Sequence, residues 1–170
     1  LLEAIQSQRY QDFEVIVVDS GSYDRTTAIA QERGARLLRI NSRDFTFGYS
    51  LNVGVEAAVG KFVVLVSAHT EPYDDLWLEN LIAPLRDEGA AMVYGRQYGT
   101  PKSKFGELRD LARTFGPERK MMSPPKFFAN NANSAIRKAL WDQKPFNEIL
   151  LGLEDIDWAK HWMKKGFEVI

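Results

Sequence analysis

The sequence contains no cysteine, which excludes disulfide bonds and thiolate chemistry and fits a reducing compartment. Neither sign of charge is in excess, because 22 lysines and arginines stand against 23 aspartates and glutamates and leave a formal net charge of −1. That balance gives no general case for a nucleic-acid partner. No apolar run reaches the roughly 18 residues that a membrane span needs, and no signal peptide is visible.

What the sequence does contain is the composition of an ordinary globular domain. With 170 residues, 45% hydrophobic and 26% charged, the chain is expected to form one domain, or most of one, and to bury about 70% of its unfolded surface. Strands are expected at 14–19, 36–40, 62–67 and 91–95, and helices at 1–8, 24–33, 48–58 and 74–87. This alternation predicts an α/β fold with a doubly wound, mostly parallel sheet and helices on both faces.

The pattern changes in the second half of the chain. Residues 101–126 are rich in proline and carry seven basic residues against three acidic ones, with helical spacing at Leu108, Leu111 and Phe115 but no strand pattern. Regular structure is expected again at 127–136, 137–142 and 154–165. Because the chain opens on the tail of a helix and closes where a strand begins, we expect both ends to continue in a longer domain.

The first polar cluster follows the strand expected at 14–19. Val15 to Val18 are all apolar, which favours a strand buried on both faces and places Asp19 at its carboxyl end, where open α/β sheets bind ligands. Gly21 permits a tight turn, and Ser22 or Asp24 can cap the next helix. Any βα turn of an α/β protein is the alternative interpretation.

Two further segments lie before and after the third strand. The helix at 48–58 carries Asn52, and the strand at 62–67 ends in Ser67, Ala68 and His69. A histidine can bind a transition metal, whereas Mg²⁺ prefers oxygen ligands. A lone histidine at a strand end is more often structural than a ligand.

The last candidates stand near the C-terminus. Glu154 and Asp155 open the helix at 154–165, where backbone donors and the helix dipole stabilise negative charge, so we expect Asp155 to stay ionised and able to accept a proton. The alternative is an acidic first turn that only caps the helix. Asn131 and Asn133 can bind sugar hydroxyls or turn backbone, and Trp77 and Trp141 are expected in the core.

In order and spacing, these segments resemble the family 2 glycosyltransferases, which have the GT-A fold. The resemblance implies a nucleotide-binding half at residues 1–99 and an acceptor-side half at 100–170, with Asp155 as the general base of an inverting reaction and Glu154 beside it. It also implies a first strand before Leu1. The implied donor is a dTDP-, UDP- or GDP-linked sugar, bound by Asp19, Ser20, Gly21, Ser22, Asn52, Ser67 and His69, and the implied acceptor-side residues are Asn131 and Asn133.

Three departures from the family pattern fall on the donor side. Ser20 replaces an acid, Leu51 replaces an arginine, and Ser67–His69 replace Asp-x-Asp, whose last acid binds the divalent metal, Mn²⁺ or Mg²⁺. His69 therefore has three interpretations: a metal ligand with help from elsewhere, a direct contact to the diphosphate, or a residue of an inactive site. Ser20 and Leu51 resemble the rhamnosyltransferase-like subset, which suggests a deoxysugar on dTDP.

The resemblance also implies partners and a location. The acceptor would be a saccharide or a lipid-linked glycan, and the work would be cytoplasmic, at or near the inner face of the membrane. Residues 101–126 would then contact an anionic membrane surface, or form a solvated linker. Two alternatives stay open: a non-catalytic protein that binds nucleotide-sugars, and a sugar-phosphate nucleotidyltransferase, whose Gly-rich loop with arginine and lysine is not seen in this sequence.

Overall fold

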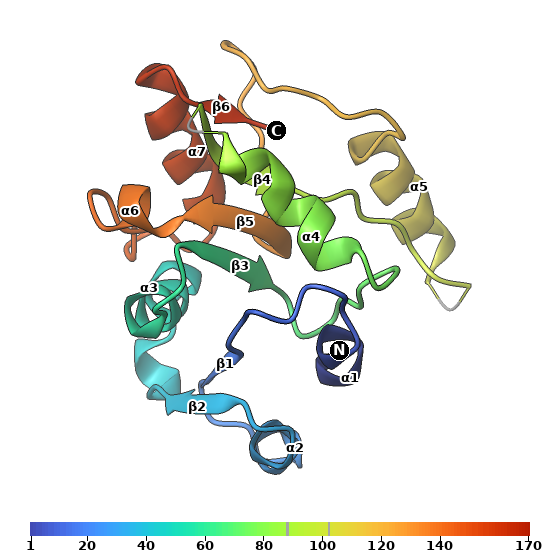
Figure 1. Cartoon of the computed structure of the whole chain (residues 1–170), viewed down its shortest axis with the longest axis vertical. Helices are drawn as coiled ribbons and strands as arrows, with labels where there is room; N and C mark the ends of the chain where they lie inside the picture. The colour runs from blue at the N-terminus through green and yellow to red at the C-terminus, as the bar shows by residue number, and fades with distance from the viewer. Residues whose placement is uncertain (88, 102) are drawn as a thin grey trace.

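Two sheets and their covering helices form the frame of the protein (Figure 1). They are seen in a computed structural model that describes residues 1–87, 89–101 and 103–170, so residue 102 of the basic segment lies outside the described residues. One sheet pairs β1 and β2 in parallel, and the other has the order β3-β5-β4-β6. The strands are β1 (Ile16–Asp19), β2 (Arg36–Arg39), β3 (Phe62–Val66), β4 (Ala90–Tyr94), β5 (Asn133–Arg137) and β6 (Glu168–Val169).

The larger sheet is mixed, because β5 runs antiparallel to both of its neighbours while β6 is parallel to β4. The long connection from β4 to β5 leaves the sheet and returns to it at the same end of the strands. There the backbone N–H of Gly95 donates to the carbonyl of Asn133 at 2.8 Å. The strand that follows must therefore run back along β4. The α/β prediction is confirmed, with one antiparallel strand inside a sheet that was expected to be mostly parallel.

The helices agree with the expected positions to within a few residues at most ends. The helix expected at 74–87 is shorter and continues as a 3₁₀ turn, because Pro84 has no N–H to donate to the preceding turn. Asp24 accepts a hydrogen bond from Thr26 N at 2.9 Å and supports the start of the second helix. The helices are α1 (Leu2–Gln6), α2 (Thr26–Glu32), η1 (Ser42–Asp44), α3 (Phe47–Ala57), α4 (Trp77–Ile82), η2 (Ala83–Arg86), α5 (Phe105–Thr114), α6 (Lys138–Trp141) and α7 (Glu154–Lys164).

Two apolar cores lie on opposite faces of the larger sheet. Neighbouring side chains of a strand point to opposite faces, so Met92 and Ile136 join the core beneath α3, α6 and α7, whereas Val93 and Ala135 join the core beneath α4 and η2. Trp158 and Trp162 of α7 are fully buried, and Trp141 lies in the same core as expected. Truncating a buried tryptophan to alanine typically costs about 3–5 kcal/mol, so this core fixes the position of α7.

The strand β1 is only half-buried, which corrects the expectation of burial on both faces. Ile16, Val17 and Val18 all keep partial exposure, and Asp19 is the one buried residue of the strand. The reason is that β1 has a partner, β2, along one edge only, and no strand of the described residues is bonded to its other edge. The apolar run shows what the sequence favours, while the pairing decides how much of it is covered.

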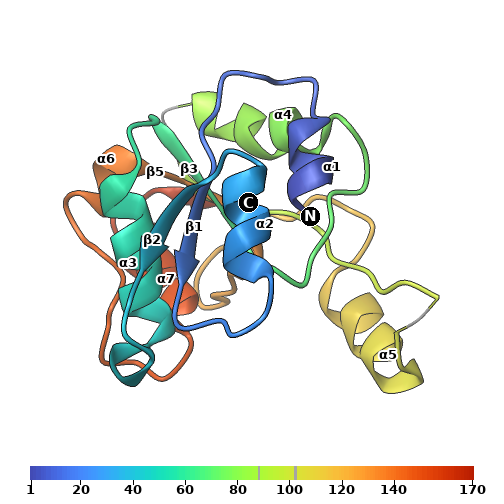
Figure 2. The ribbon, with the colours of Figure 1, turned by 90° about the horizontal axis from the view of Figure 1, so that it is seen from below.

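The basic segment forms a helix that stands apart from the sheets (Figure 2). The helical spacing is confirmed in α5, yet none of its residues is buried. The segment is fixed at its end instead, where Phe115 is buried and its ring lies 6.5 Å from Tyr94 and 5.9 Å from Phe128. Every helix in the described ranges is too short or too polar to cross a bilayer.

Candidate active site

Asp19 organises the turn at the end of β1. Its carboxylate accepts hydrogen bonds from Gly21 N and Ser22 N, each at 3.1 Å, and Gly21 has φ 111°, a conformation that side chains disfavour. The bond to the Ser22 side chain lowers the pKa of Asp19 most, and the two backbone donors and Arg39 add to it against the effect of burial. The structure therefore presents Asp19 ionised in a fixed turn, with Ser20 half-buried and Ser22 exposed beside it.

Ser67 and His69 form the turn after β3. The Ser67 N–H donates to the carbonyl of Ala132 at 3.0 Å, which ties the turn to the start of β5. The Ser67 hydroxyl lies 3.3 Å from Nδ1 of His69 and 3.5 Å from His69 N. Because the imidazole is exposed, its other nitrogen, Nε2, is free to meet a ligand.

Asp155 and Glu154 begin α7, and both contact Asn131. Asp155 accepts from Asn131 N at 3.2 Å and from Ile156 N at 2.7 Å, while the Asn131 side-chain amide donates to Glu154 at 3.4 Å. Burial raises the pKa of Asp155, against the lowering effect of the backbone donors of Ile156, Asn131 and Asp155 itself. Desolvation outweighs these donors, so burial adds to the helix start in setting the pKa of Asp155.

The pKa of Glu154 is also raised, and this shift has a second cause. Burial raises its pKa, and the neighbouring charge of Asp155 raises it further. The side chain is 6% exposed, so it is the less accessible of the two acids. A carboxylate with a raised pKa is a stronger base, and Asp155 is the one of the pair with more exposure to a substrate.

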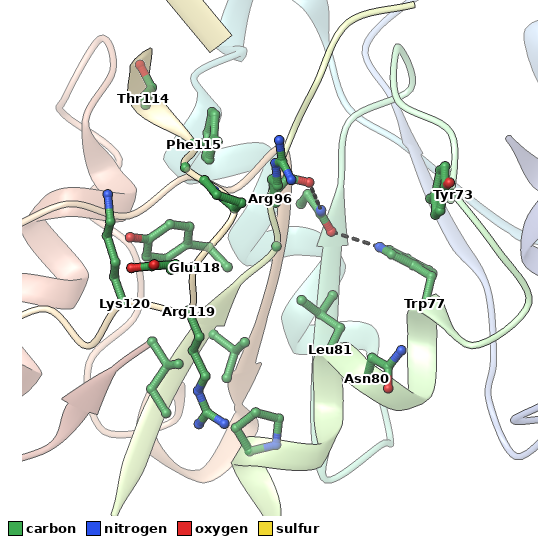
Figure 3. Close-up of a pocket in the computed structure, with 18 of the residues that line it drawn as sticks. Tyr73, Trp77, Asn80, Leu81, Arg96, Thr114, Phe115, Glu118, Arg119 and Lys120 are labelled. Atoms are coloured by element: carbon green, nitrogen blue, oxygen red, sulfur yellow. Dashed lines mark hydrogen bonds between the residues drawn. The ribbon is translucent and has the colours of Figure 1, made fainter. Parts of the chain in front are cut away.

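Residues 131–133, which lead into β5, join these parts, a relationship that the sequence does not reveal. Asn131 holds Asp155, and Ala132 holds the Ser67 turn through its carbonyl. Asn133 accepts from Trp77 Nε1 at 3.0 Å and donates to the carbonyl of Arg96 at 3.5 Å (Figure 3). We call residues 131–133 the junction. Its bonds fix Asn133 within the framework, while Asn131 lies between the two acids.

Asn52 is placed by the structure in a buried cluster with the loop before α7. Its Oδ1 accepts from Trp141 Nε1 at 2.9 Å and Phe146 N at 3.0 Å, and its Nδ2 donates to Phe146 O at 2.9 Å and Glu148 at 2.8 Å. These four bonds use the full capacity of an amide side chain. Asn52 therefore anchors residues 146–148.

Hydrogen bonds connect some of the predicted residues and not others. The turn at Asp19 belongs to the smaller sheet, and no hydrogen bond found in the described part of the chain joins it to the junction. Ser67 and Asp155 are both bonded to the junction, and His69 contacts Ser67. One residue that the sequence interpretation missed is Arg96, which stands two residues after the end of β4 and follows a strand end as His69 does.

The side chains near His69 do not fit a metal centre by themselves. No group of three or more histidine, cysteine or acidic side chains that could hold a metal occurs in residues 1–87, 89–101 and 103–170. Among the residues that the structure describes, the Ser67 hydroxyl is the side-chain group found within bonding distance of His69, whereas Mg²⁺ needs near-octahedral oxygen ligands. No catalytic step is therefore derived through a metal.

Solved structures with the same arrangement of elements are glycosyltransferases. A mannosyltransferase from Pyrobaculum calidifontis, determined in complex with GDP-Man and Mn²⁺, superposes with a TM-score of 0.73 at 20% identity, covering 99% of this chain and 48% of that one. At this identity the likeness concerns the fold. The fold is the GT-A glycosyltransferase fold.

The sequence places the chain more closely. Residues 1–143 match the family described as Glycosyl transferase family 2, and the chain belongs to that family. It is 26% identical to the O-antigen chain rhamnosyltransferase RfbN of Salmonella typhimurium, over 99% of this chain and 57% of RfbN. It is 27% identical to the GalNAc(5)-diNAcBac-PP-undecaprenol beta-1,3-glucosyltransferase of Campylobacter jejuni, over 99% and 56%. The chain thus spans about half the length of these curated relatives.

Proposed function

We propose that the protein is an inverting glycosyltransferase that moves a sugar from a nucleotide-sugar to an acceptor hydroxyl in glycan biosynthesis. The observation that carries the proposal is the position of Asp155, which is held by Asn131 N and Ile156 N and has its pKa raised by burial. The residue that holds it lies next to Ala132, to which the Ser67 turn is bonded. The proposed base and the polar turn after β3 are thus held by consecutive residues, Asn131 and Ala132.

In this reaction the acceptor oxygen attacks the anomeric carbon on the face opposite the diphosphate. The new carbon–oxygen bond forms as the bond to the diphosphate breaks, and the electron pair of that bond leaves with the diphosphate. The carboxylate of Asp155 takes the hydroxyl proton, which makes the attacking oxygen a better nucleophile. Asn131 and Ile156 keep the carboxylate oriented through backbone bonds that need no rearrangement.

On the donor side we assign His69 a direct contact to the diphosphate. Ser67 Oγ lies within reach of His69 N as an acceptor, so its own hydrogen is free to point at Nδ1 of the imidazole. That arrangement places the ring hydrogen on Nε2, which then donates to a phosphate oxygen. The opposite tautomer would leave Nε2 as a metal ligand, so a metal brought in with the donor is the competing outcome.

The remaining donor contacts are proposed at the Asp19 turn, where Asp19, Ser20, Gly21 and Ser22 would hold the nucleotide part. Asn52 is proposed as a positioning residue in place of its expected donor contact, because its amide bonds are all used within the protein. The similarity to an O-antigen chain rhamnosyltransferase supports a deoxysugar on dTDP. UDP- and GDP-linked sugars are the alternative donors.

The acceptor is proposed to be a saccharide carried on a lipid diphosphate. A relative of this chain is named for a PP-undecaprenol acceptor, and α5 exposes Phe105 and Leu108 next to basic residues of the segment 101–126. An anionic membrane surface attracts such a segment. The protein would then act at the cytoplasmic face of the membrane.

A thermal-shift screen of the full-length protein against nucleotide-sugars, with and without Mn²⁺, identifies the donor, because a ligand at 100 times its Kd stabilises by about 2.7 kcal/mol. Transfer to saccharide acceptors then follows by NMR of the product, whose anomeric configuration is expected to be inverted. Retention would contradict the role of Asp155. Donor binding with neither transfer nor donor hydrolysis would favour the non-catalytic alternative, and formation of a nucleotide-sugar from a sugar phosphate would favour the nucleotidyltransferase.

A further inference from the structure

A cavity opens between α4, the end of β4 and residues 114–120 (Figure 3). Its volume is about 390 Å³, which falls in the range of about 300–1,000 Å³ that small-molecule sites occupy. The Asp19 turn, the Ser67 turn and the acids of α7 are absent from its described lining, and Asn133 is the one predicted site residue that lines it. The cavity is therefore separate from the proposed donor contacts.

Aromatic rings supply much of the lining. Trp77, Tyr73, Tyr94 and Phe115 face the cavity, with Leu81 between them. The ring of Trp77 is fixed, because its Nε1 is bonded to Asn133. Flat, preorganised aromatic faces bury the apolar C–H faces of a ligand at a low cost in conformational entropy, and pyranose rings present such faces.

The polar lining offers both acceptors and donors. Asp74 and Glu118 supply carboxylates, and the cations are Arg96, Arg119 and Lys120. Figure 3 shows Trp77 on one side of the cavity, with Glu118 and Arg119 across from it. The ion pairs found among the described residues involve none of these cations. Sugar hydroxyls donate and accept at once and match this mixture, and the two carboxylates offset most of the attraction that the three cations exert on an anionic ligand.

The cavity begins close to the proposed base. Asn133 lies in its lining, and Asn131, two residues earlier, holds Asp155. Two residues of chain span at most about 7 Å. The cavity lining and the peptide group that holds Asp155 thus belong to the same short segment of chain.

We propose that this cavity binds the neutral saccharide unit next to the acceptor sugar, and so selects which glycan is extended. The inference rests on the proposed transferase function and names the acceptor class of that site. Arg119 is the residue best suited to test it, because it is exposed and its guanidinium has five donors for hydroxyl oxygens. Arg113 of α5 is an exposed arginine outside the lining and serves as the matched control.

The test uses the full-length protein, with NMR saturation transfer and calorimetry on methyl glycosides and the corresponding disaccharides. We expect at least one disaccharide to bind more tightly than its monosaccharide. Arg119→Gln should weaken that disaccharide about tenfold, the effect of losing one hydrogen bond to a charged group, and leave the monosaccharide unchanged. Arg113→Gln should change neither.

Three results would overturn the inference: no glycoside binds the wild-type protein, Arg119→Gln leaves the disaccharide affinity intact, or a phosphorylated glycoside binds more tightly than its neutral form. The donor-induced thermal shift is measured on the same samples. If that shift persists in Arg119→Gln while saccharide binding does not depend on Arg119, this inference fails and the transferase proposal stands. If no nucleotide-sugar shifts the wild-type protein, the transferase proposal itself fails.

Discussion

The backbone N–H of Asn131 lies 3.2 Å from Oδ2 of Asp155, and this hydrogen bond joins the turn before β5 to the start of α7. The next residue along, Ala132, accepts from Ser67 N at 3.0 Å. Three segments that are far apart in sequence are thus positioned by consecutive peptide groups. A backbone donor cannot be removed by a side-chain change, which makes this support robust to substitution at Asn131 itself.

The raised pKa of Asp155 predicts the acid limb of the pH profile. A base must be ionised to accept a proton, so transfer should fall as the pH drops through the pKa of Asp155. Because burial raises that pKa, the limb should lie above the ordinary aspartate value of about 3.9. The measurement is kcat of the full-length protein against pH, with saturating donor and acceptor.

Glu154→Gln is the control for that profile. Glutamine keeps an oxygen that can accept from Asn131, and it removes the charge that repels Asp155. The acid limb should therefore persist, at the same pH or at a slightly lower one. Loss of the limb in Glu154→Gln would move the base role to Glu154.

The same shifts affect stability with a defined sign. A carboxyl whose folded pKa is raised binds more protons in the folded state, so the free energy of unfolding falls as pH rises from the ordinary carboxyl pKa to the raised one. Asp155 and Glu154 both act in this direction. Equilibrium unfolding of Glu154→Gln should consequently show a weaker decline over that pH window than wild type, and an unchanged decline would contradict the burial of Glu154.

The cluster at Asn52 should be important for stability. Asn52→Ala leaves Trp141 Nε1 and the backbone N–H and C=O of Phe146 without their buried partner, and we expect a loss of about 2–4 kcal/mol in the free energy of unfolding.

Gly48→Ala should also destabilise, by about 1–3 kcal/mol, since a Cβ would press on the backbone of Asn147 and Glu148. Chemical denaturation measures both.

Gly106→Ala in α5 is the matched control for the glycine. A Cβ there meets no atom within 4 Å, and alanine is the better helix former by about 1 kcal/mol. Stability should stay level or rise slightly. Equal losses in Gly48→Ala and Gly106→Ala would show that the close approach to residues 147–148 has no energetic effect.

The tautomer assigned to His69 predicts how metal and donor binding respond to mutation. His69→Ala should weaken binding of the nucleotide-sugar about tenfold, through loss of one hydrogen bond to a charged group, with or without Mn²⁺. His69→Gln retains a donor and should recover part of the affinity. If wild-type affinity depends on Mn²⁺ and His69→Ala removes only that dependence, His69 is a metal ligand; unchanged affinity under all conditions would make it structural.

Much of the fold could be predicted from the sequence because its strands and helices differ in apolar period. The strand at 62–66 and the helix at 154–164 appear within a residue of their expected ends. The antiparallel direction of β5 could not be predicted, since it depends on where the long connection from β4 re-enters the sheet. Nor could the partial exposure of Val15 to Val18, because pairing, not composition, decides burial.

The candidate site divides in the same way. Residue type and spacing placed Asp19 at a strand end and Asp155 at a helix start. They could not show that the Asn52 amide is hydrogen-bonded to Phe146, a residue 94 positions away. Nor could they show that at Asp155 the effect of desolvation on the pKa would outweigh that of the backbone donors. Both depend on tertiary packing, which local pattern does not contain.

The most direct test compares Asp155→Asn with wild type in the full-length protein, measuring sugar transfer and donor affinity on the same samples. Asparagine keeps the size of the side chain and an oxygen for one backbone donor, but it cannot accept the acceptor's proton. We expect kcat to fall by about 10²–10⁴, the usual contribution of a general base, while the donor Kd changes less than twofold. Transfer at the wild-type rate would contradict the role of Asp155 as the base.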